Sequence, residues 1–318
     1  MELKPAQRTD AEYAAMAAIW NAQYPHYPET AAEYADWDGR RSDRFPHHRL
    51  ILWEGGEIIG YTTFLQSHWC YDPKRFHFTI QVAKPHRRKG HGTRCLLHII
   101  SQVKPLGIET LMTDAVEDHD ESQAFLLKQG FTLAQRNPVS ELRLEGYDLS
   151  RHKAKLDGAL AQGIRFVTAE ELVAKEPEML KRLHQLSCEL EADTPQPGEY
   201  QPPSFEDWMR MRWESPMTLR DSWIIAMDGD NPAGFTLYSA RGEDGKRLSV
   251  EMTGTARGYR RRGIASALKY KAIEYAMARG AEVVVTDNEE SNPMFSINLA
   301  FGFEAKPAWA SYEKRIAE

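Results

Sequence analysis

An internal repeat constrains the fold of this chain more than any other feature of its sequence. Arg-Arg-Lys-Gly-His-Gly at residues 87–92 returns as Arg-Arg-Arg-Gly-Ile-Ala at residues 260–265, which is 173 positions later. A Gly-Phe pair follows each copy, at 130–131 and at 302–303, with a separation of 172. Solenoid units are about 20 to 50 residues long, so a period of this length that occurs twice indicates a duplicated domain.

Each half has the same order of predicted elements. An amphipathic helix, at 10–22 and at 177–191, precedes two strands that a tight turn joins. A third strand leads into the glycine-rich segment, which opens a helix, and a short strand, a last helix and a closing strand follow. This order predicts an α/β (α+β) fold with a mixed, mostly antiparallel central sheet flanked by helices in each half. We expect two domains, residues 1–150 and 151–318, with a charged helical connector at 151–162.

Composition excludes several classes of protein. Forty basic and 46 acidic side chains give a net charge of -6, the wrong sign for a chain whose main partner is nucleic acid. No apolar run approaches the about 18 residues of a membrane span. Cys70, Cys95 and Cys188 form no Cys-x-x-Cys pair, which is typical of proteins in the reducing cytoplasm. Since the histidines also lack the spacing of metal ligands, we expect a cytoplasmic protein without a metal; its oligomeric state stays open.

The glycine-rich segment is suited to binding a diphosphate. It lies between a strand and a helix, where small residues let a ligand approach the backbone. The unpaired N–H groups of the first helical turn and the helix dipole attract an anion, and the arginines add positive charge. The alternative is that the glycines form an ordinary turn and that the arginines lie on a solvated loop. The segment occurs twice between a strand and a helix, which favours a binding site. The spacing of the glycines differs from that of the loop that binds nucleoside triphosphates and from that of the Gly-x-Gly-x-x-Gly motif that binds dinucleotides.

With these residues, the sequence resembles the GNAT superfamily of N-acetyltransferases, whose motif A, Gln/Arg-x-x-Gly-x-Gly/Ala, binds the pyrophosphate of acetyl-CoA. Both copies fit that motif, the Gly-Phe pairs are similar to motif B, and the layout looks like that of mycothiol synthase and related tandem GNAT proteins over nearly the whole chain. In the first half the resemblance implies a CoA site made by Val82, Arg87, Arg88, Lys89, Gly90, His91, Gly92 and Thr93. In the second half it implies one made by Thr253, Gly254, Thr255, Arg260, Arg261, Arg262, Gly263, Ile264, Ala265 and Ser266, with Asn288, Asn292 and Asn298 on the pantetheine arm. Turn formation is the alternative role for the first two asparagines.

Acetyl transfer to an amine requires a group that takes up the proton of the amine. Strand alternation puts Glu251 on one face with Ser249 and Thr253, and we take Glu251 as the candidate general base. A solvated glutamate on an edge strand is the alternative. At a separation of 173 the first half has Phe78, which takes no proton, and the neighbouring His77 faces the other way. We therefore expect the second domain to be catalytic and the first to be degenerate or structural, although its arginines imply that it can still bind CoA.

The general acid departs from the pattern of the family. Many GNAT enzymes have a tyrosine four residues before the motif B glycine, where this chain has Leu126 and Asn298. Tyr312 in the closing strand or Tyr238 could substitute, or the thiolate could leave unaided; for Tyr312, packing in the core is the alternative role. The sequence thus predicts an acetyl-CoA-dependent N-acetyltransferase that acts directly on a small-molecule amine. The alternative is a non-catalytic regulatory protein that binds acyl-CoA.

Overall fold

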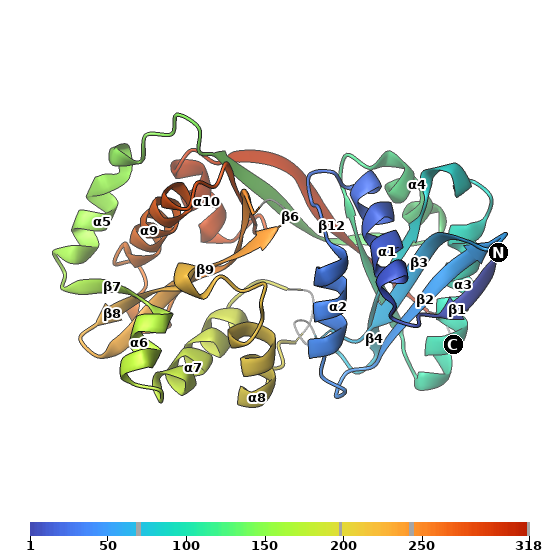
Figure 1. The fold of residues 1–318 in the computed structure, drawn as a ribbon, viewed down its shortest axis with the longest axis horizontal. Coiled ribbons are helices and arrows are strands. Elements are labelled where there is room, and N and C mark those ends of the chain that lie inside the picture. Colours follow the sequence, from blue (N-terminus) through green and yellow to red (C-terminus); the bar gives the residue numbers. More distant parts are fainter. Residues whose placement is uncertain (68–70, 197–198, 242–244, 317–318) are drawn as a thin grey trace. The chain divides into compact units, whose positions relative to one another are not determined.

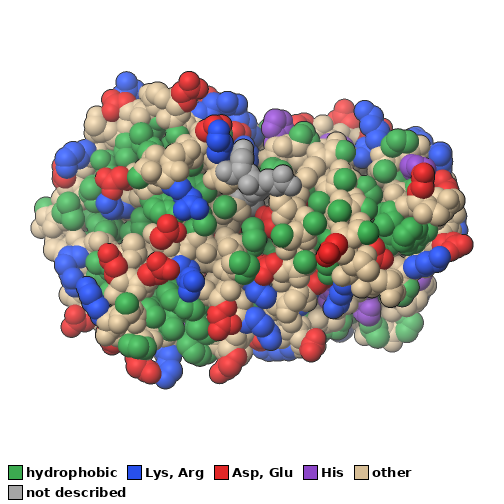
Figure 2. All heavy atoms as spheres, in the orientation of Figure 1, with side chains coloured by type: hydrophobic (Ala, Val, Ile, Leu, Met, Phe, Trp, Pro, Cys, Tyr) green, Lys and Arg blue, Asp and Glu red, His purple; other side chains and the backbone are tan. Residues whose placement is uncertain are grey.

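The chain divides into two compact units. The structure is a computed structural model that describes residues 1–67, 71–196, 199–241 and 245–316. Unit 1 comprises residues 1–136, 196–201 and 309–318, and unit 2 comprises residues 137–195 and 202–308 (Figure 1). Figure 2 shows basic and acidic side chains interspersed on this face of both units. Within the described residues, no helix has the length and apolar character that a bilayer span requires.

Unit 1 is a sheet with helices on both faces, in the strand order β1-β2-β3-β4-β5-β12. Its strands are β1 (Glu2–Pro5), β2 (His47–Glu54), β3 (Glu57–Leu65), β4 (Arg75–Val82), β5 (Thr110–Val116) and β12 (Glu304–Arg315). Its helices are α1 (Asp10–Gln23), α2 (Ala31–Arg40), α3 (His91–Val103) and α4 (Asp120–Lys128). Tyr13 and Tyr34 from α1 and α2 pack on one face of the sheet, whereas Leu96 and Leu126 from α3 and α4 pack on the other.

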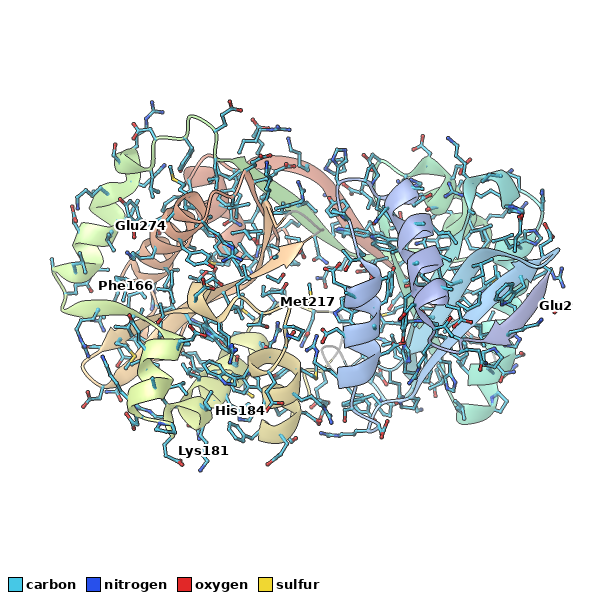
Figure 3. The ribbon with its side chains drawn as sticks, in the orientation of Figure 1. Glu2, Phe166, Lys181, His184, Met217 and Glu274 are labelled. Carbon is cyan, nitrogen blue, oxygen red and sulfur yellow. The ribbon has the colours of Figure 1, made fainter. Side chains whose placement is uncertain are left out.

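Unit 2 repeats this plan in the strand order β6-β11-β10-β9-β8-β7. Its strands are β6 (Thr132–Arg143), β7 (Ile164–Thr168), β8 (Ile224–Asp228), β9 (Asn231–Arg241), β10 (Arg247–Thr255) and β11 (Val283–Asp287). Its helices are α5 (Lys153–Leu160), α6 (Ala169–Lys175), α7 (Met179–Ala192), α8 (Phe205–Trp208), α9 (Ile264–Ala278) and α10 (Pro293–Ala300). His184 of α7 lies against α8, where its ring is 5.5 Å from that of Trp208 (Figure 3).

Short turns connect several of these elements. The 3-10 turns are η1 (Lys84–His86), η2 (Lys104–Leu106), η3 (Leu149–His152), η5 (Arg220–Ser222) and η6 (Arg257–Tyr259), and η4 (Met209–Trp213) is a turn of π-helix. The η1 and η6 turns occupy the same place in the two units, directly before the glycine-rich loop.

Each sheet contains one parallel pair of strands, and this pair separates along its length. β4 and β5 pair in parallel at residues 75–77 and 110–112, and β10 and β11 pair at 247–249 and 283–285. The other recorded pairings are antiparallel, so the predicted mixed, mostly antiparallel sheets are confirmed. β4 and β10 continue beyond the short paired stretch toward the glycine-rich loop, and in unit 1 a cavity lies where β4 and β5 separate.

The closing strands leave the halves of the sequence to which they belong. From Asn137 onward β6 is part of unit 2, where residues 139–143 pair with β11. From Trp309 onward β12 is part of unit 1, where residues 309–315 pair with β5. The units therefore differ from the predicted domains 1–150 and 151–318. Because the two halves are alike, each closing strand finds an equivalent sheet edge in either unit, as in domain swapping. The repeat in the sequence therefore does not tell whether a closing strand pairs within its own half or with the other half.

Candidate functional site

Both glycine-rich segments form the same loop between a strand and a helix. Arg88 and Arg261 each have a φ of 62°, and Gly90 and Gly263, at the N-caps of α3 and α9, have φ of 82° and 78°. The left-handed backbone costs a non-glycine residue roughly 1 to 2 kcal/mol. Since no side chain caps either helix, the N–H groups of the first turn remain available to an anion. The predicted strand–loop–helix context is thus confirmed in both copies.

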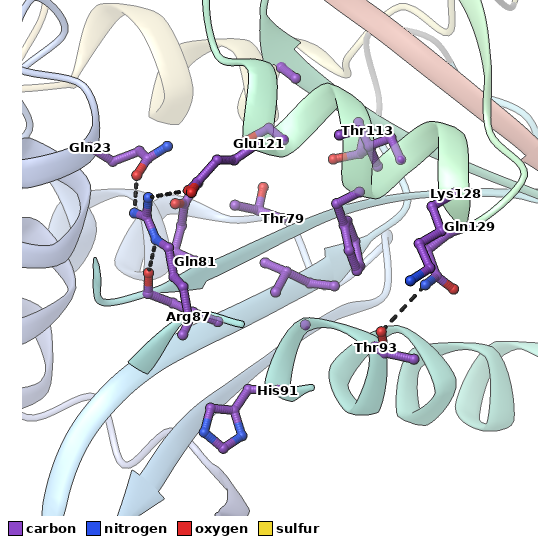
Figure 4. Close-up of a pocket in the computed structure, with 18 of the residues that line it drawn as sticks. Gln23, Thr79, Gln81, Arg87, His91, Thr93, Thr113, Glu121, Lys128 and Gln129 are labelled. Carbon is purple, nitrogen blue, oxygen red and sulfur yellow. Dashed lines mark hydrogen bonds and ion pairs between the residues drawn. The ribbon is translucent and has the colours of Figure 1, made fainter. Parts of the chain in front are cut away.

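In unit 1 this loop borders a cavity of about 490 Å³ (Figure 4). The cavity lies where β4 and β5 separate, and α1, α3 and α4 contribute to its wall. Of the predicted residues, those that line it are Val82, Arg87, Arg88, Gly90, His91, Gly92 and Thr93. Lys89, in the same loop, is exposed and is not part of the lining. The structure therefore brings together most of the residues that the motif predicts in the first half.

Arg87 holds this loop to its surroundings. Its Nε donates to the backbone oxygen of Val82 at 2.9 Å, and its Nη1 donates to Glu121 Oε2 at 3.3 Å. A further hydrogen bond joins Arg87 to Gln23 at the end of α1 (Figure 4). In unit 2 Arg260 repeats the first contact, because its Nε donates to the oxygen of Thr255 at 3.2 Å. The first arginine of each motif thus fixes the loop to the end of the preceding strand.

His91 is the first residue of α3 and is among the residues that line the cavity, but Figure 4 shows its imidazole directed away from Arg87 and Thr93. The side chain is 6% exposed, and neither ring nitrogen has a hydrogen-bond partner among the described residues. Burial lowers the pKa of this histidine, although Glu54, 3.5 Å away, opposes the shift. The His91 side chain therefore packs beside Glu54 beneath the loop, and the backbone of this first helical turn faces the anion site.

Contacts between α3 and α4 close the same wall. Gln129 Nε2 donates to Thr93 Oγ1 at 3.3 Å (Figure 4). A Cβ on Gly92 would lie 3.4 Å from the ring of Phe125, which is ordinary van der Waals contact, so the packing of the two helices does not by itself require glycine here. The small residue in this motif position leaves the backbone of the first helical turn accessible to a ligand.

In unit 2 acidic side chains neutralise the arginines of the loop. Asp193, which follows α7, accepts hydrogen bonds from Arg257 at 2.6 Å and from Arg260. These arginines, Arg257 first, lower the pKa of Asp193 to about 2. Arg262 lies 3.5 Å from Asp228, and Arg261 is exposed. Ile264 is buried in the core below the loop, and Ala265 and Ser266 continue the first turn of α9.

Glu251 is the extra residue of a β-bulge. The register between β9 and β10 shifts between Val250 and Met252, whereas β3 and β4 pair without a shift over residues 77–82. Val250 lies opposite Tyr238 in the same way that Phe78 lies opposite Phe64. Phe78 therefore corresponds to Val250, and the predicted match of Phe78 with Glu251 is wrong, because Glu251 has no counterpart in β4.

The bulge also changes which side chains share a face with Glu251. Ser239 and Met252 point to the side of α7, and Glu251 bonds to Ser239. Thr253 instead contacts Thr236 at 2.8 Å on the opposite face of the sheet. The predicted shared face of Glu251 and Thr253 is thus wrong, because one inserted residue reverses the alternation beyond it. Gly254 again faces α7, and a Cβ added to it would lie 2.8 Å from a side-chain carbon of Leu190.

A chain of polar contacts holds the carboxylate of Glu251. Ser239 donates to its Oε1, and Arg212 Nη1 donates to its Oε2 at 3.2 Å. Arg212 also lies 3.5 Å from Glu191 of α7. The Glu251 side chain is 23% exposed and belongs to a strand with neighbours on both sides. A carboxylate in this place is reachable from solvent and is paired with a guanidinium.

The predicted acid candidates lie elsewhere. Tyr312 belongs to unit 1, where its hydroxyl donates to Gln123 at 3.2 Å and burial raises its pKa. The structure therefore does not bring Tyr312 and Glu251 together within one unit. Tyr238 is fully buried in the core of unit 2, its hydroxyl lacks a hydrogen-bond partner among the described residues, and burial raises its pKa strongly.

The three asparagines divide into a pair and a helix cap. Asn298 is fully buried, and its Nδ2 donates to Asn288 Oδ1 at 2.7 Å. Asn298 Oδ1 has no hydrogen-bond partner within the described part of the chain. Asn292 is the N-cap of α10 and accepts from the N–H of Met294 at 3.0 Å. Its local role is therefore the turn-forming one.

Several residues of the unit 1 cavity were not found from the sequence. Gln23 and Tyr24 end α1, Gln81 lies in β4, and Glu121 and Ser122 begin α4. Burial raises the pKa of the Tyr24 hydroxyl, and hydrogen bonding with Gln81, Gln23 and Ser122 opposes the shift. No motif marks these positions in the sequence.

Comparisons with known proteins agree with this arrangement. The sequence profile of the Acetyltransferase (GNAT) family matches residues 13–131 and 182–303. Among curated proteins, no sequence matches the chain.

Solved structures of the same fold cover the whole chain. A tandem GNAT protein from the clavulanic acid biosynthesis pathway is similar over 100% of this chain and 99% of its own, with a TM-score of 0.74 and 16% identity. A GCN5-related N-acetyltransferase from Sphaerobacter thermophilus matches over 100% of this chain and 96% of its own, with a TM-score of 0.69 and 17% identity. At such identities the similarity shows the fold. The two profile matches and the two repeated units establish that the chain belongs to the GNAT acetyltransferase family, with two such domains in tandem.

Proposed function

We propose that this protein is an acetyl-CoA-dependent N-acetyltransferase that acts on the amine of a small molecule, with catalysis in unit 2. The observation that carries the proposal is the position of Glu251. The bulge adds a carboxylate to the strand that runs from the parallel pair to the glycine-rich loop, on the side of α7. Such a group is suited to accept the proton of an attacking amine, directly or through a water molecule. The reducing cytoplasm remains the predicted location.

Acetyl-CoA supplies the acyl thioester, and the residues of unit 2 bind and orient the reactants. The N–H groups of residues 263–266 and the exposed Arg261 bind the diphosphate. The backbone of residues 253–255 orients the thioester, and Asn288 with Asn298 binds the pantetheine arm. Ser239 and Arg212 hold the Glu251 carboxylate in place, so transfer occurs directly between the two bound substrates.

No tyrosine acts as the general acid that protonates the departing thiolate. Tyr238 is buried in the core, and Tyr312 belongs to unit 1. A thiolate leaves more readily than an alkoxide, because thiols are the stronger acids; the cysteine thiol has a pKa of about 8.5. We therefore assign the acid step to solvent.

The cavity of unit 1 supports acyl-CoA binding there as well. Its loop combines left-handed backbone with a helix N-terminus that no side chain caps, which suits a diphosphate. It also favours a second function, that of a regulatory protein that binds acyl-CoA without turnover, because unit 1 has no counterpart of Glu251.

Release of CoA from acetyl-CoA, followed with a thiol reagent over a library of small amines, separates these functions. Sustained release with one class of amine supports the enzyme. Tight binding of acetyl-CoA by calorimetry without release supports the regulator. Absence of binding at millimolar acetyl-CoA would refute both.

A further inference from the structure

Away from both loops, unit 1 contains a cluster of arginines around one aspartate. Asp38 of α2 is 3% exposed, and its Oδ2 lies 2.6 Å from Nη1 of Arg49 on β2 and 3.7 Å from Nε of Arg8. The Tyr13 hydroxyl donates to the same oxygen at 3.0 Å. Arg49 is 5% exposed and also donates from Nε to Thr63 Oγ1 at 3.3 Å. One carboxylate oxygen therefore serves two guanidinium groups and a phenol.

Arg41 adds a third guanidinium that this aspartate does not pair. It follows α2 as the C-cap residue and is partly buried. Within the described part of the chain, no carboxylate lies within 4.0 Å of it. Burial lowers the pKa of Arg41, and the charges of Arg49 and Arg8 lower it further, whereas the charge of Asp38, three residues earlier on α2, opposes the shift. The cluster thus holds three positive groups and one negative group.

His47 completes the cluster from the start of β2. Its Nε2 is buried and has no hydrogen-bond partner among the described residues. Burial, followed by the charges of Arg41, Arg49 and Arg8, lowers the pKa of His47 to about 3, so its ring is neutral at neutral pH. A neutral imidazole next to surplus positive charge offers an N–H donor without adding to the repulsion.

Partly buried guanidinium groups that repel one another are costly unless an anion joins them. Guanidinium forks bind carboxylate and phosphate oxygens in pairs, which makes arginine the preferred residue for these groups. The cluster reaches the surface at Arg8, whose side chain is 56% exposed. We propose that Arg41, Arg8 and Arg49, together with His47, form a binding site for the anionic group of a small molecule, a carboxylate or a phosphate.

This site is distinct from the diphosphate loop and independent of the proposed function. Arg49 lies opposite Thr63 on β3, and Thr63 lies opposite Thr79 on β4, a residue of the cavity lining. Two strand spacings therefore separate the backbone of Arg49 from that of the cavity, about 10 Å. The cluster shares no residue with the lining of the cavity.

The test titrates the full chain with inorganic phosphate and, separately, with succinate, by calorimetry at constant ionic strength in sodium chloride. We expect saturable binding of at least one anion, and the tighter one identifies the ligand group. Arg41→Gln should weaken that binding roughly tenfold or more. Arg44→Gln is the matched control, because Arg44 is exposed, lies over the ring of Phe45 and carries the same charge. It should bind as the unchanged protein does.

Phosphate can also bind to the glycine-rich loops. The affinity of those sites should not change in Arg41→Gln, which distinguishes them from the proposed site. Each titration is repeated with acetyl-CoA, and the difference between the two variants decides the proposal whether or not acetyl-CoA binds. Equal affinities in Arg41→Gln and Arg44→Gln, or no saturable binding of either anion, would overturn it. Thermal unfolding adds a second readout: Arg41→Gln should not lower Tm in chloride. A drop there would mean that Arg41 has a structural partner, and would also refute the site.

Discussion

Replacing Glu251 by glutamine removes one negative charge and keeps the shape of the side chain. The amide oxygen can still accept from Ser239, but Arg212 loses the anionic partner at 3.2 Å and keeps Glu191 at 3.5 Å. We expect a loss of about 1 to 2 kcal/mol in the free energy of unfolding, which leaves unit 2 folded. Positioned general bases contribute about 10² to 10⁴ in rate, so kcat should fall by that factor. Affinity for acetyl-CoA should stay unchanged, because Glu251 is not part of the loop.

The assay combines initial rates of CoA release, at saturating amine and acetyl-CoA, with calorimetric binding of acetyl-CoA. Glu191→Gln is the matched control, since it removes the other carboxylate that contacts Arg212 and leaves the bulge intact. It should lower the free energy of unfolding by a similar amount with little effect on kcat. Turnover by Glu251→Gln within a factor of about two of the unchanged protein would remove Glu251 from the mechanism. Equal losses of kcat in both variants would show that only the position of Arg212 matters.

Three further predictions concern backbone strain, a buried charge and the closing strand. Gly90→Ala, at a φ of 82°, should cost about 1 kcal/mol of stability and weaken acetyl-CoA binding to unit 1 in calorimetry; unchanged binding would argue against the loop as the site. Lys269 is 1% exposed, and burial lowers its pKa to about 7. The unfolded chain therefore holds one more proton between pH 7 and 10, so stability should rise there by about 1 kcal/mol per pH unit, and denaturant titrations of Lys269→Met should lack this rise. Tyr312→Phe should lower the free energy of unfolding by about 1 kcal/mol through loss of the bond to Gln123 and leave kcat unchanged; a large fall in kcat would restore Tyr312 as an acid.

The periodic part of the fold was predictable, because each half repeats the same elements and the motifs mark their ends. The 173-residue separation located both loops and the helices that follow them. The bulge at Glu251 was not predictable, since one extra residue between Val250 and Met252 leaves a pattern that still reads as a strand. Gln23 and Glu121 reach Arg87 from α1 and α4, and such long-range contacts leave no local signal.

The crossing of the last strands limits how this polypeptide can be cut. A fragment that stops at Ser150 lacks β12, the partner of β5, and one that starts there lacks β6, the partner of β11. Each fragment still has a closing strand of its own, and that strand would have to take the vacant edge. Where it did not, a bare row of amide and carbonyl groups would remain and favour aggregation.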